Sequence, residues 1–283
     1  MTIDVVGSAS VRYPDALSAL GDSRPAQLFM IGNESHLLPP AVAIVGTRDA
    51  TTYGVRVTRM LATAFASRGV SVVSGMARGI DAAAHRAALE AGGRTVAVLG
   101  TGVDVPYPVG HRELHRVIGE KGCVVSEYGS GVGARPGTFP RRNRIIAGLA
   151  PVTIVVEAGV KSGALLTADY AQRLNRTVAA VPGPIDSPQS MGTNQLIRDH
   201  SHVIASVADA LALMGFESSG ERAPMQLSGQ DAKVWKALAA GPLAPDEIAL
   251  KCHITTRDCL ASITSLELEG MVEMLLTGEV RRR

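Results

Sequence analysis

Short, nearly continuous apolar runs alternate with amphipathic segments over residues 41–213. The runs are rich in β-branched residues, which is typical of strands buried on both faces of a parallel sheet. The predicted strands are Ala41–Val45, Val70–Val73, Thr95–Leu99, Cys123–Val125, Val152–Val156 and Thr177–Val181. Such strand–helix alternation predicts an α/β domain with a Rossmann-like, doubly wound, mainly parallel sheet.

The segments between the runs have helical periodicity. Apolar residues recur at helical spacing after the first predicted strand, at Val57, Met60, Leu61, Ala64 and Phe65. This spacing predicts one stripe that packs on the core. Residues 1–40 show no such pattern and are expected to form an irregular lead-in.

The rhythm changes after residue 213. Residues 214–228 are polar and uneven and are interpreted as a linker. Three predicted helices (Gln230–Ala239, Pro245–Lys251 and Thr255–Leu268) precede a predicted hairpin of strands Met271–Leu276 and Glu279–Arg283. This order predicts a small C-terminal winged-helix domain over residues 229–283.

Nearly every predicted strand of the large domain ends in a glycine-containing turn. In an open parallel sheet the carboxyl ends of the strands form the ligand crevice, and the helices that follow offer free N–H groups to phosphate. Three cations, Arg48, Arg78 and Lys161, come just after strand ends. The alternative for any single glycine is turn geometry alone.

A local concentration of positive charge lies in a predicted long loop. Between Glu127 and Glu157 there is no acidic residue, whereas four arginines occur there, at 135, 141, 142 and 144. Phe139 stands among them. An aromatic ring beside arginines is the composition of a site that stacks bases and holds phosphates. The alternative is an ordinary solvated basic face.

Composition narrows the possible functions. The formal net charge is only +2, so an anion site must be a local feature. The cysteines Cys123, Cys252 and Cys259 show no paired spacing, which favours a reducing compartment without disulfides or a zinc site. The N-terminus has no leader pattern, and the apolar stretch 145–156 is too short for a membrane span. A cytoplasmic protein is expected.

Known cofactor and catalytic motifs are incomplete. The Gly100-Thr101-Gly102 turn lacks the third glycine of a dinucleotide fingerprint, because Val105 stands there. Lys161-Ser162 lacks the glycines of a phosphate-binding loop, and neither HExxH nor GxSxG occurs. We therefore expect no cofactor, no metal and no enzymatic activity.

Several longer strings resemble a known family. They are VAIVGTR (42–48), SGMARGID (74–81), AVLGTGVD (97–104), SEYGS (126–130), FPRRNRIIAGLA (139–150), VVEAGVKSGALLTA (155–168), AVPGP (180–184) and GTNQLI (192–197). In this order they closely resemble the DprA/Smf family of DNA-processing proteins. The C-terminal segment resembles the winged-helix domain that the family optionally carries.

The resemblance implies a homodimer that binds single-stranded DNA without sequence specificity and loads the recombinase RecA onto it, in natural transformation or homologous recombination. Resemblance and charge pattern together assign the following residues to DNA: Gly46, Thr47, Arg48, Ser74, Gly75, Met76, Ala77, Arg78, Gly79, Phe139, Arg141, Arg142, Asn143, Arg144, Lys161, Ser162 and Gly163. For the dimer, Leu196, Ile197, Val203 and Ile204 are candidates, with ordinary core as their alternative.

Two other functions are kept as alternatives. The first is a nucleotide-binding protein or nucleoside-monophosphate hydrolase of the wider Rossmann-like group, although the PGGxGTxxE motif of such hydrolases is missing around Glu157. The second is a winged-helix transcription regulator. Its third helix would carry Arg257 against Asp258, Glu267 and Glu269, a net negative charge that suits a DNA groove poorly.

Overall fold

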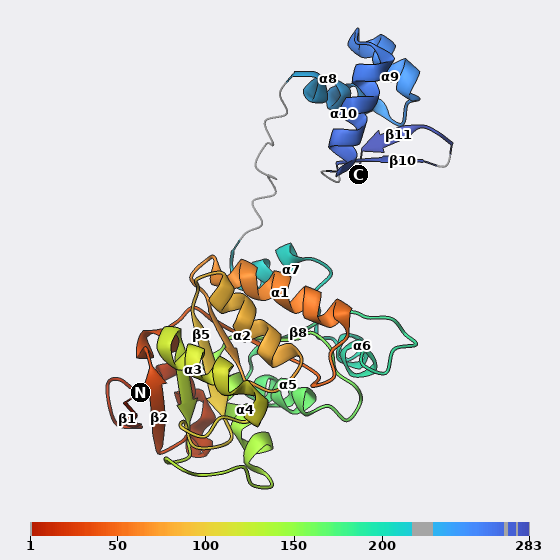
Figure 1. Ribbon diagram of the computed structural model, residues 1–283. Helices are drawn as coiled ribbons and strands as arrows, with labels where there is room; N and C mark the ends of the chain where they lie inside the picture. Colours follow the sequence, from red (N-terminus) through yellow and green to blue (C-terminus); the bar gives the residue numbers. More distant parts are fainter. Residues whose placement is uncertain (1, 217–228, 269–270, 276, 283) are drawn as a thin grey trace. The chain divides into compact units, whose positions relative to one another are not determined.

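The computed structural model describes residues 2–216, 229–268, 271–275 and 277–282 (Figure 1). The chain forms two compact units, residues 1–218 and residues 219–283. Most of the predicted linker 214–228 lies outside the described residues, as do Glu269, Leu276 and Arg283.

The first unit is built on a nine-stranded sheet in the described part of the chain. Its strands are β1 (Asp4–Gly7), β2 (Gln27–Gly32), β3 (Ala41–Val45), β4 (Ser71–Ser74), β5 (Thr95–Leu99), β6 (Cys123–Ser126), β7 (Val152–Val155), β8 (Thr177–Ala180) and β9 (His202–Val203). The order is β1-β2-β6-β5-β4-β3-β7-β8-β9. The pairs β1/β2 and β2/β6 are antiparallel and all others are parallel. All six predicted strands are confirmed to within a residue or two.

Helices cover both faces of this sheet. They are η1 (Asp15–Ser23), η2 (Glu34–Leu37), α1 (Thr52–Ala66), α2 (Ile80–Glu90), η3 (Val109–His111), α3 (Arg112–Lys121), α4 (Thr138–Leu149), α5 (Gly163–Arg173), α6 (Met191–Arg198) and α7 (Val207–Ala212). Helices α1, α2 and α7 share one core with Val42 and Ile44 of β3. Segments η1, α4 and α5 share the opposite core with Ala43 and Val45. Alternate residues of β3 thus enter different cores, which explains its uninterrupted apolar run.

The predicted stripe on α1 is largely confirmed. Leu61 and Phe65 are buried, and Val57 and Ala64 pack partly against the same core. Met60 was predicted in the stripe but is 52% exposed. It lies at the margin of the stripe, where the helix surface turns toward solvent.

The expectation of an irregular lead-in over residues 1–40 was wrong. Strand β2 pairs with β6 from Phe29↔Ser126 to Gly32↔Cys123, and β1 pairs with β2. These strands were missed because 3₁₀ segments separate them from each other and from β3, so the strand–helix rhythm is absent. Leu17 and Leu28 are fully buried in the core of the unit.

The strand order reverses beside β3. From β3 the chain proceeds through β4 and β5 to β6 on one side, and then α4 carries it back to β7 on the other side of β3. Helices α1 and α4 lie on opposite faces. The loops that follow β3 and β7 therefore diverge. This divergence opens a crevice at the carboxyl ends of these two strands.

The second unit has the predicted winged-helix order. Its elements are α8 (Gly229–Ala237), η4 (Leu238–Ala240), α9 (Pro245–Cys252), α10 (Thr256–Leu268), β10 (Val272–Met274) and β11 (Val280–Arg282). The hairpin is antiparallel, with Val272 opposite Arg282. Val234, Ile248, Ile263 and Val280 are buried in one core. None of the helices among the described residues is both long and apolar enough to cross a membrane.

A substitution at Gly32 tests how closely strand β2 packs against its neighbours in the sheet. Its φ is +102°, and a Cβ there would lie 2.4 Å from the carbonyl oxygen of Gly122. Gly69 also has positive φ (+72°), but a Cβ there would meet nothing within 4 Å. We expect Gly69→Ala to cost about 1 kcal/mol of unfolding free energy and Gly32→Ala a further ~1–3 kcal/mol because of the clash. Urea-induced unfolding measures both, and equal losses would contradict close packing of β2.

Candidate functional site

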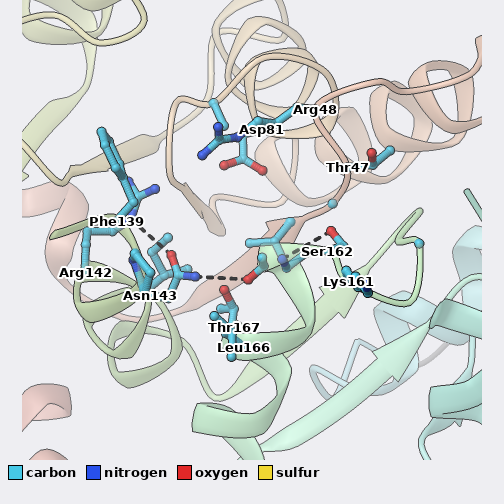
Figure 2. Close-up of a pocket in the computed structure, with 18 residues that line it drawn as sticks. Thr47, Arg48, Asp81, Phe139, Arg142, Asn143, Lys161, Ser162, Leu166 and Thr167 are labelled. Carbon is cyan, nitrogen blue, oxygen red and sulfur yellow. Dashed lines mark hydrogen bonds between the residues drawn. The ribbon is translucent and has the colours of Figure 1, made fainter. Parts of the chain in front are cut away.

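A pocket of about 490 Å³ occupies the crevice at the strand-order reversal. It is bounded by the loop after β3, the start of α2, the first turns of α4 and the start of α5. Figure 2 shows the side chains that surround it: Thr47, Arg48 and Asp81, then Phe139, Arg142 and Asn143, and then Lys161, Ser162, Leu166 and Thr167. The carboxyl-end crevice predicted from the sequence is thus present.

The loop after β3 is rigidly held and presents Arg48. A Cβ on Gly46 would lie 2.5 Å from Ile80 Cγ1 and 2.8 Å from the Glu157 carbonyl oxygen, so the position requires glycine. The Thr47 N–H donates to the Glu157 carbonyl at 2.7 Å. Arg48 is exposed at the pocket and forms no ion pair with any described residue. Its charge is available to a ligand.

Glu157 faces away from the pocket. Its carboxylate accepts hydrogen bonds from the Thr51 N–H at 2.9 Å and the Thr51 hydroxyl at 2.5 Å. Thr51 is the N-cap of α1, so Glu157 neutralises the positive end of that helix dipole. The side chain is buried, with only 2% of the residue exposed. Its role in this geometry is to cap α1.

The N-terminus of α5 opens into the pocket. Ser162 is its N-cap and accepts a hydrogen bond from the Ala164 N–H, and Lys161, Ser162 and Gly163 all line the cavity. Lys161 and Gly163 are exposed. Free N–H groups at a helix start, beside a lysine, make a binding place for an anion such as phosphate.

The arginine-rich segment is a helix, so the predicted long loop was wrong. Phe139, Arg141, Arg142, Asn143 and Arg144 all belong to α4. The misprediction arose from Gly137 and Pro140. Gly137 has φ +84° and immediately precedes the helix, while Pro140 stands in the first turn, where its missing N–H costs nothing. As a result, successive arginines point in different directions instead of lining one loop.

Arg142 lies inside the protein and forms the wall of the pocket. Its guanidinium donates to the carbonyl oxygen of Gly75 at 2.8 Å and to that of Val98. A Cβ on Gly75 would lie 2.4 Å from the guanidinium, so glycine makes room for it. Burial lowers the pKa of Arg142 to about 10, and the charge of nearby Asp81 opposes this shift. Arg142 therefore stays protonated at neutral pH.

Arg144 is not a candidate for DNA contact, contrary to the sequence-based prediction. Its guanidinium forms two 2.8 Å hydrogen bonds to the carboxylate of Glu127 and one of 2.9 Å to the Ser23 carbonyl. Both side chains of the pair are buried, at 6% and 7% exposure. Arg141 is 66% exposed and lies 3.4 Å from the same carboxylate. The local charge of the segment is therefore partly neutralised within the fold.

The loop after β4 divides into buried and exposed residues. The Ser74 hydroxyl donates to the Ile44 carbonyl, and the Met76 side chain is fully buried in spite of a positive φ of 56°. Gly79, with φ +73°, lies against the Thr47 carbonyl. Ala77 lines the pocket and Arg78 is exposed beside it. Only Ala77 and Arg78 of this loop have side chains placed to meet a ligand.

The sequence analysis missed several pocket residues, of which three have side chains that bear on the chemistry of the site. Asp81 and Thr167 line the main cavity, and the Tyr107 ring packs on Phe139 with a centroid distance of 4.7 Å. Burial raises the pKa of Asp81, whose carboxylate accepts from the Gly75 N–H at 3.1 Å. Asp81 is the last residue of the SGMARGID string, so its place in that motif was the available signal. Across the described ranges, no three His, Cys, Asp or Glu residues cluster as metal ligands.

The fold and the pocket together define a Rossmann-like α/β protein with a cationic crevice and a separate winged-helix unit. The family model for DNA recombination-mediator protein A matches residues 4–215, and that for the DprA winged helix domain matches residues 218–275. The chain belongs to the DNA recombination-mediator protein A family, also called DprA/Smf. The resemblance found in the sequence is confirmed.

Individual relatives agree with this assignment. A putative DNA processing protein DprA of Mycobacterium tuberculosis is 41% identical over 268 residues, which cover 92% of this chain and 67% of the relative. Protein Smf of Escherichia coli is 40% identical over 282 residues, covering 96% and 75%.

Two solved structures share the fold of the first unit. DNA processing protein A from Streptococcus pneumoniae superposes with a TM-score of 0.71 at 40% identity, covering 75% of this chain and 74% of that one. DNA processing protein A from Helicobacter pylori superposes with a TM-score of 0.68 at 28% identity, covering 76% and 96%. The latter structure was described for its single-stranded DNA binding mode.

Substitutions at Arg144 and Arg141 should differ in their effect on stability, because the first side chain is buried and the second is exposed. Arg144→Met leaves Glu127 buried without its main partner, and we expect a loss of about 3–5 kcal/mol of unfolding free energy. Arg141→Met removes an exposed side chain and should change stability by less than about 0.5 kcal/mol. Denaturant titration of both variants checks the difference. A stable Arg144→Met protein would show that the pair with Glu127 does not hold α4 in place.

Proposed function

We propose that the protein binds single-stranded DNA, without sequence preference, in the crevice of its first unit. The observation that carries this proposal is the meeting of Arg48, Lys161 and the free start of α5 with the Phe139 ring around one cavity. Cations and helix N–H groups bind phosphates, and an aromatic ring stacks on any base. Membership of the DprA/Smf family and the single-stranded DNA binding described for the Helicobacter pylori relative support it.

The charges that would face the strand are fewer than the sequence pattern indicated. Arg48, Arg78 and Lys161 are exposed at the cavities, and Arg141 is exposed on α4, where Glu127 partly neutralises it. Arg142 and Arg144 are buried and bonded internally. Four phosphate contacts would give a log–log salt slope near −3, at about −0.7 per contact for single strands. Duplex DNA should bind less well, because its bases are stacked inside and cannot reach Phe139.

The family resemblance further suggests delivery of RecA to the bound strand, in transformation or recombination, by a homodimer. Among the residues considered for the dimer interface, Ile204 is buried in the core that contains α1, and Leu196 packs partly against the core on the opposite face of the sheet. Ile197 is half-buried and Val203, on the edge strand β9, is exposed. We therefore keep Ile197 and Val203 as interface candidates. Two linked crevices would raise the effective concentration on a long strand.

The two alternative functions receive less support. In the hydrolases considered, the motif carboxylate would stand at Glu157, but Glu157 caps α1 and does not line the pocket. Asp81 does line the pocket, but its carboxylate accepts from the Gly75 N–H and its charge is balanced by Arg142. A sequence-reading winged helix would need several free cations on α10 or its wing. In the described part of α10, Arg257 is the one basic residue, and it is exposed next to Asp258. Arg281 is paired with Glu273, and the Arg282 guanidinium donates to the Trp235 carbonyl and covers its ring.

Arg48 and Phe139 should contribute differently to binding. Arg48→Ala should weaken binding and flatten the salt slope by about 0.7, because one phosphate contact is lost. Phe139→Ala should cost about 1–3 kcal/mol while leaving the slope unchanged, because stacking releases no counterions. Fluorescence anisotropy of a labelled oligothymidylate at several salt concentrations measures both effects.

Arg173 is the matched control for these variants. It lies at the far end of α5 and pairs with Asp169, so Arg173→Ala should leave affinity and slope unchanged. If Arg48→Ala behaved like Arg173→Ala, the crevice would not be the DNA site.

The proposal also predicts no turnover of nucleotides. Incubation with AMP, NAD or ATP should release neither base, ribose phosphate nor phosphate, since Glu157, where the motif carboxylate of such hydrolases would stand, is engaged by Thr51. Chromatography of the reaction mixture tests this. Turnover that Glu157→Gln abolishes would replace the binding function by the hydrolase.

A further inference from the structure

A second, smaller cavity adjoins the main pocket. It has a volume of about 290 Å³ and shares Arg48, Ala77, Phe139 and Arg142 with its larger neighbour. Tyr107, Pro108, Gly75 and Arg78 complete its lining. The two cavities therefore meet at Phe139, and a ligand that fills the first can continue into the second.

Tyr107 is an aromatic residue whose exposure needs an explanation. Its ring packs on Phe139 at an interplanar angle of 36°, yet 38% of the residue remains exposed. The hydroxyls of Tyr13 and Tyr53 donate to the carbonyls of Pro25 and Pro182. In contrast, the Tyr107 hydroxyl forms no hydrogen bond within the described residues. Tyr107 thus contributes an accessible ring rather than a structural polar contact.

The cavity also has its own cation. Arg78 is exposed, and its ion pair with the still more exposed Asp49 is loose, at 3.8 Å. A phosphate could replace this partner at little cost, because a solvated pair of this kind contributes almost nothing. The second cavity thus repeats the combination found in the first, an aromatic ring beside an available cation on a concave surface.

We propose that this second cavity is an additional nucleotide subsite, in which Tyr107 stacks the neighbouring base of the strand and Arg78 binds its phosphate. The inference rests on the proposed function. Phe139 stands between the two subsites, and Arg48, which lines both, lies where the linking phosphate would pass. The crevice then holds at least two consecutive nucleotides of one strand.

Oligothymidylates of increasing length test the subsite, with anisotropy as the readout on the full-length protein. Tyr107→Ala should leave the affinity for the shortest bound oligonucleotide nearly unchanged. It should lower the affinity for longer ones about tenfold or more, without altering the salt slope. Tyr107→Phe keeps the ring and should bind like the wild type.

Arg78→Ala tests the phosphate contact of the subsite. It should flatten the salt slope for long oligonucleotides by about 0.7. Val109→Ala is the control, because Val109 is the exposed first residue of η3, two positions after Tyr107, and does not line the cavity.

Photocrosslinking separates stacking by Tyr107 from a mere packing role beside Phe139. Oligonucleotides that carry 5-iododeoxyuridine at successive positions should give adducts on both rings, mapped by mass spectrometry, at neighbouring positions of the strand. Adducts on Phe139 alone, or a Tyr107→Ala variant with wild-type affinity at every length, would overturn the second subsite while leaving the DNA-binding function intact. A wild-type protein that binds no oligonucleotide would instead overturn the proposed function.

Discussion

The buried guanidinium of Arg142 is the interaction on which the crevice depends. It reaches from α4 to the Gly75 carbonyl after β4 and to the Val98 carbonyl of β5. Its Nε donates to the side-chain oxygen of Asn143 at 3.3 Å, and the Asn143 amide donates to the Gly163 carbonyl at the start of α5 at 3.1 Å. One chain of hydrogen bonds thus joins three walls of the pocket. A loop-built site without such a chain would have to be ordered by the ligand, at a cost in binding free energy.

Burying this charge is possible only because the surrounding groups compensate for it. Two carbonyl dipoles accept from the guanidinium, and the carboxylate of Asp81 favours its charged form. Asp81 is in turn held by the Gly75 N–H. Removal of either partner would leave the other charge buried and uncompensated. The resulting loss of unfolding free energy would be much larger than the net stabilisation that the pair provides. The residues that shape the cavity are therefore needed for the stability of the fold, whether or not a ligand is bound.

Some features of the fold can be predicted from the local sequence pattern, and others cannot. The strands β3 to β8 were predicted closely because burial on both faces leaves an unbroken apolar run. Strands β1 and β2 were missed because antiparallel strands joined through 3₁₀ segments lack that rhythm. The crevice and its exposed cations Arg48 and Lys161 followed from strand ends. The burial of Arg142 and Arg144 could not be predicted, because their partners Gly75 and Glu127 lie 67 and 17 residues away.

The fold answers a question that the proposed function raises, namely how a chain with a net charge of only +2 would bind a polyanion. Like charges placed together repel one another, and a cluster of four arginines on one loop would destabilise the protein. Helix α4 instead turns Arg142 and Arg144 inward, toward carbonyls and Glu127, and leaves Arg141 outside. The positive potential of the crevice then comes from a few exposed cations on separate elements, together with the start of α5. In the proposed binding mode, stacking on fixed rings adds to the contribution of charge. Under the proposed function, such a site would tolerate salt better than a purely basic surface, and it would favour strands whose bases are unpaired over duplexes that offer only phosphates.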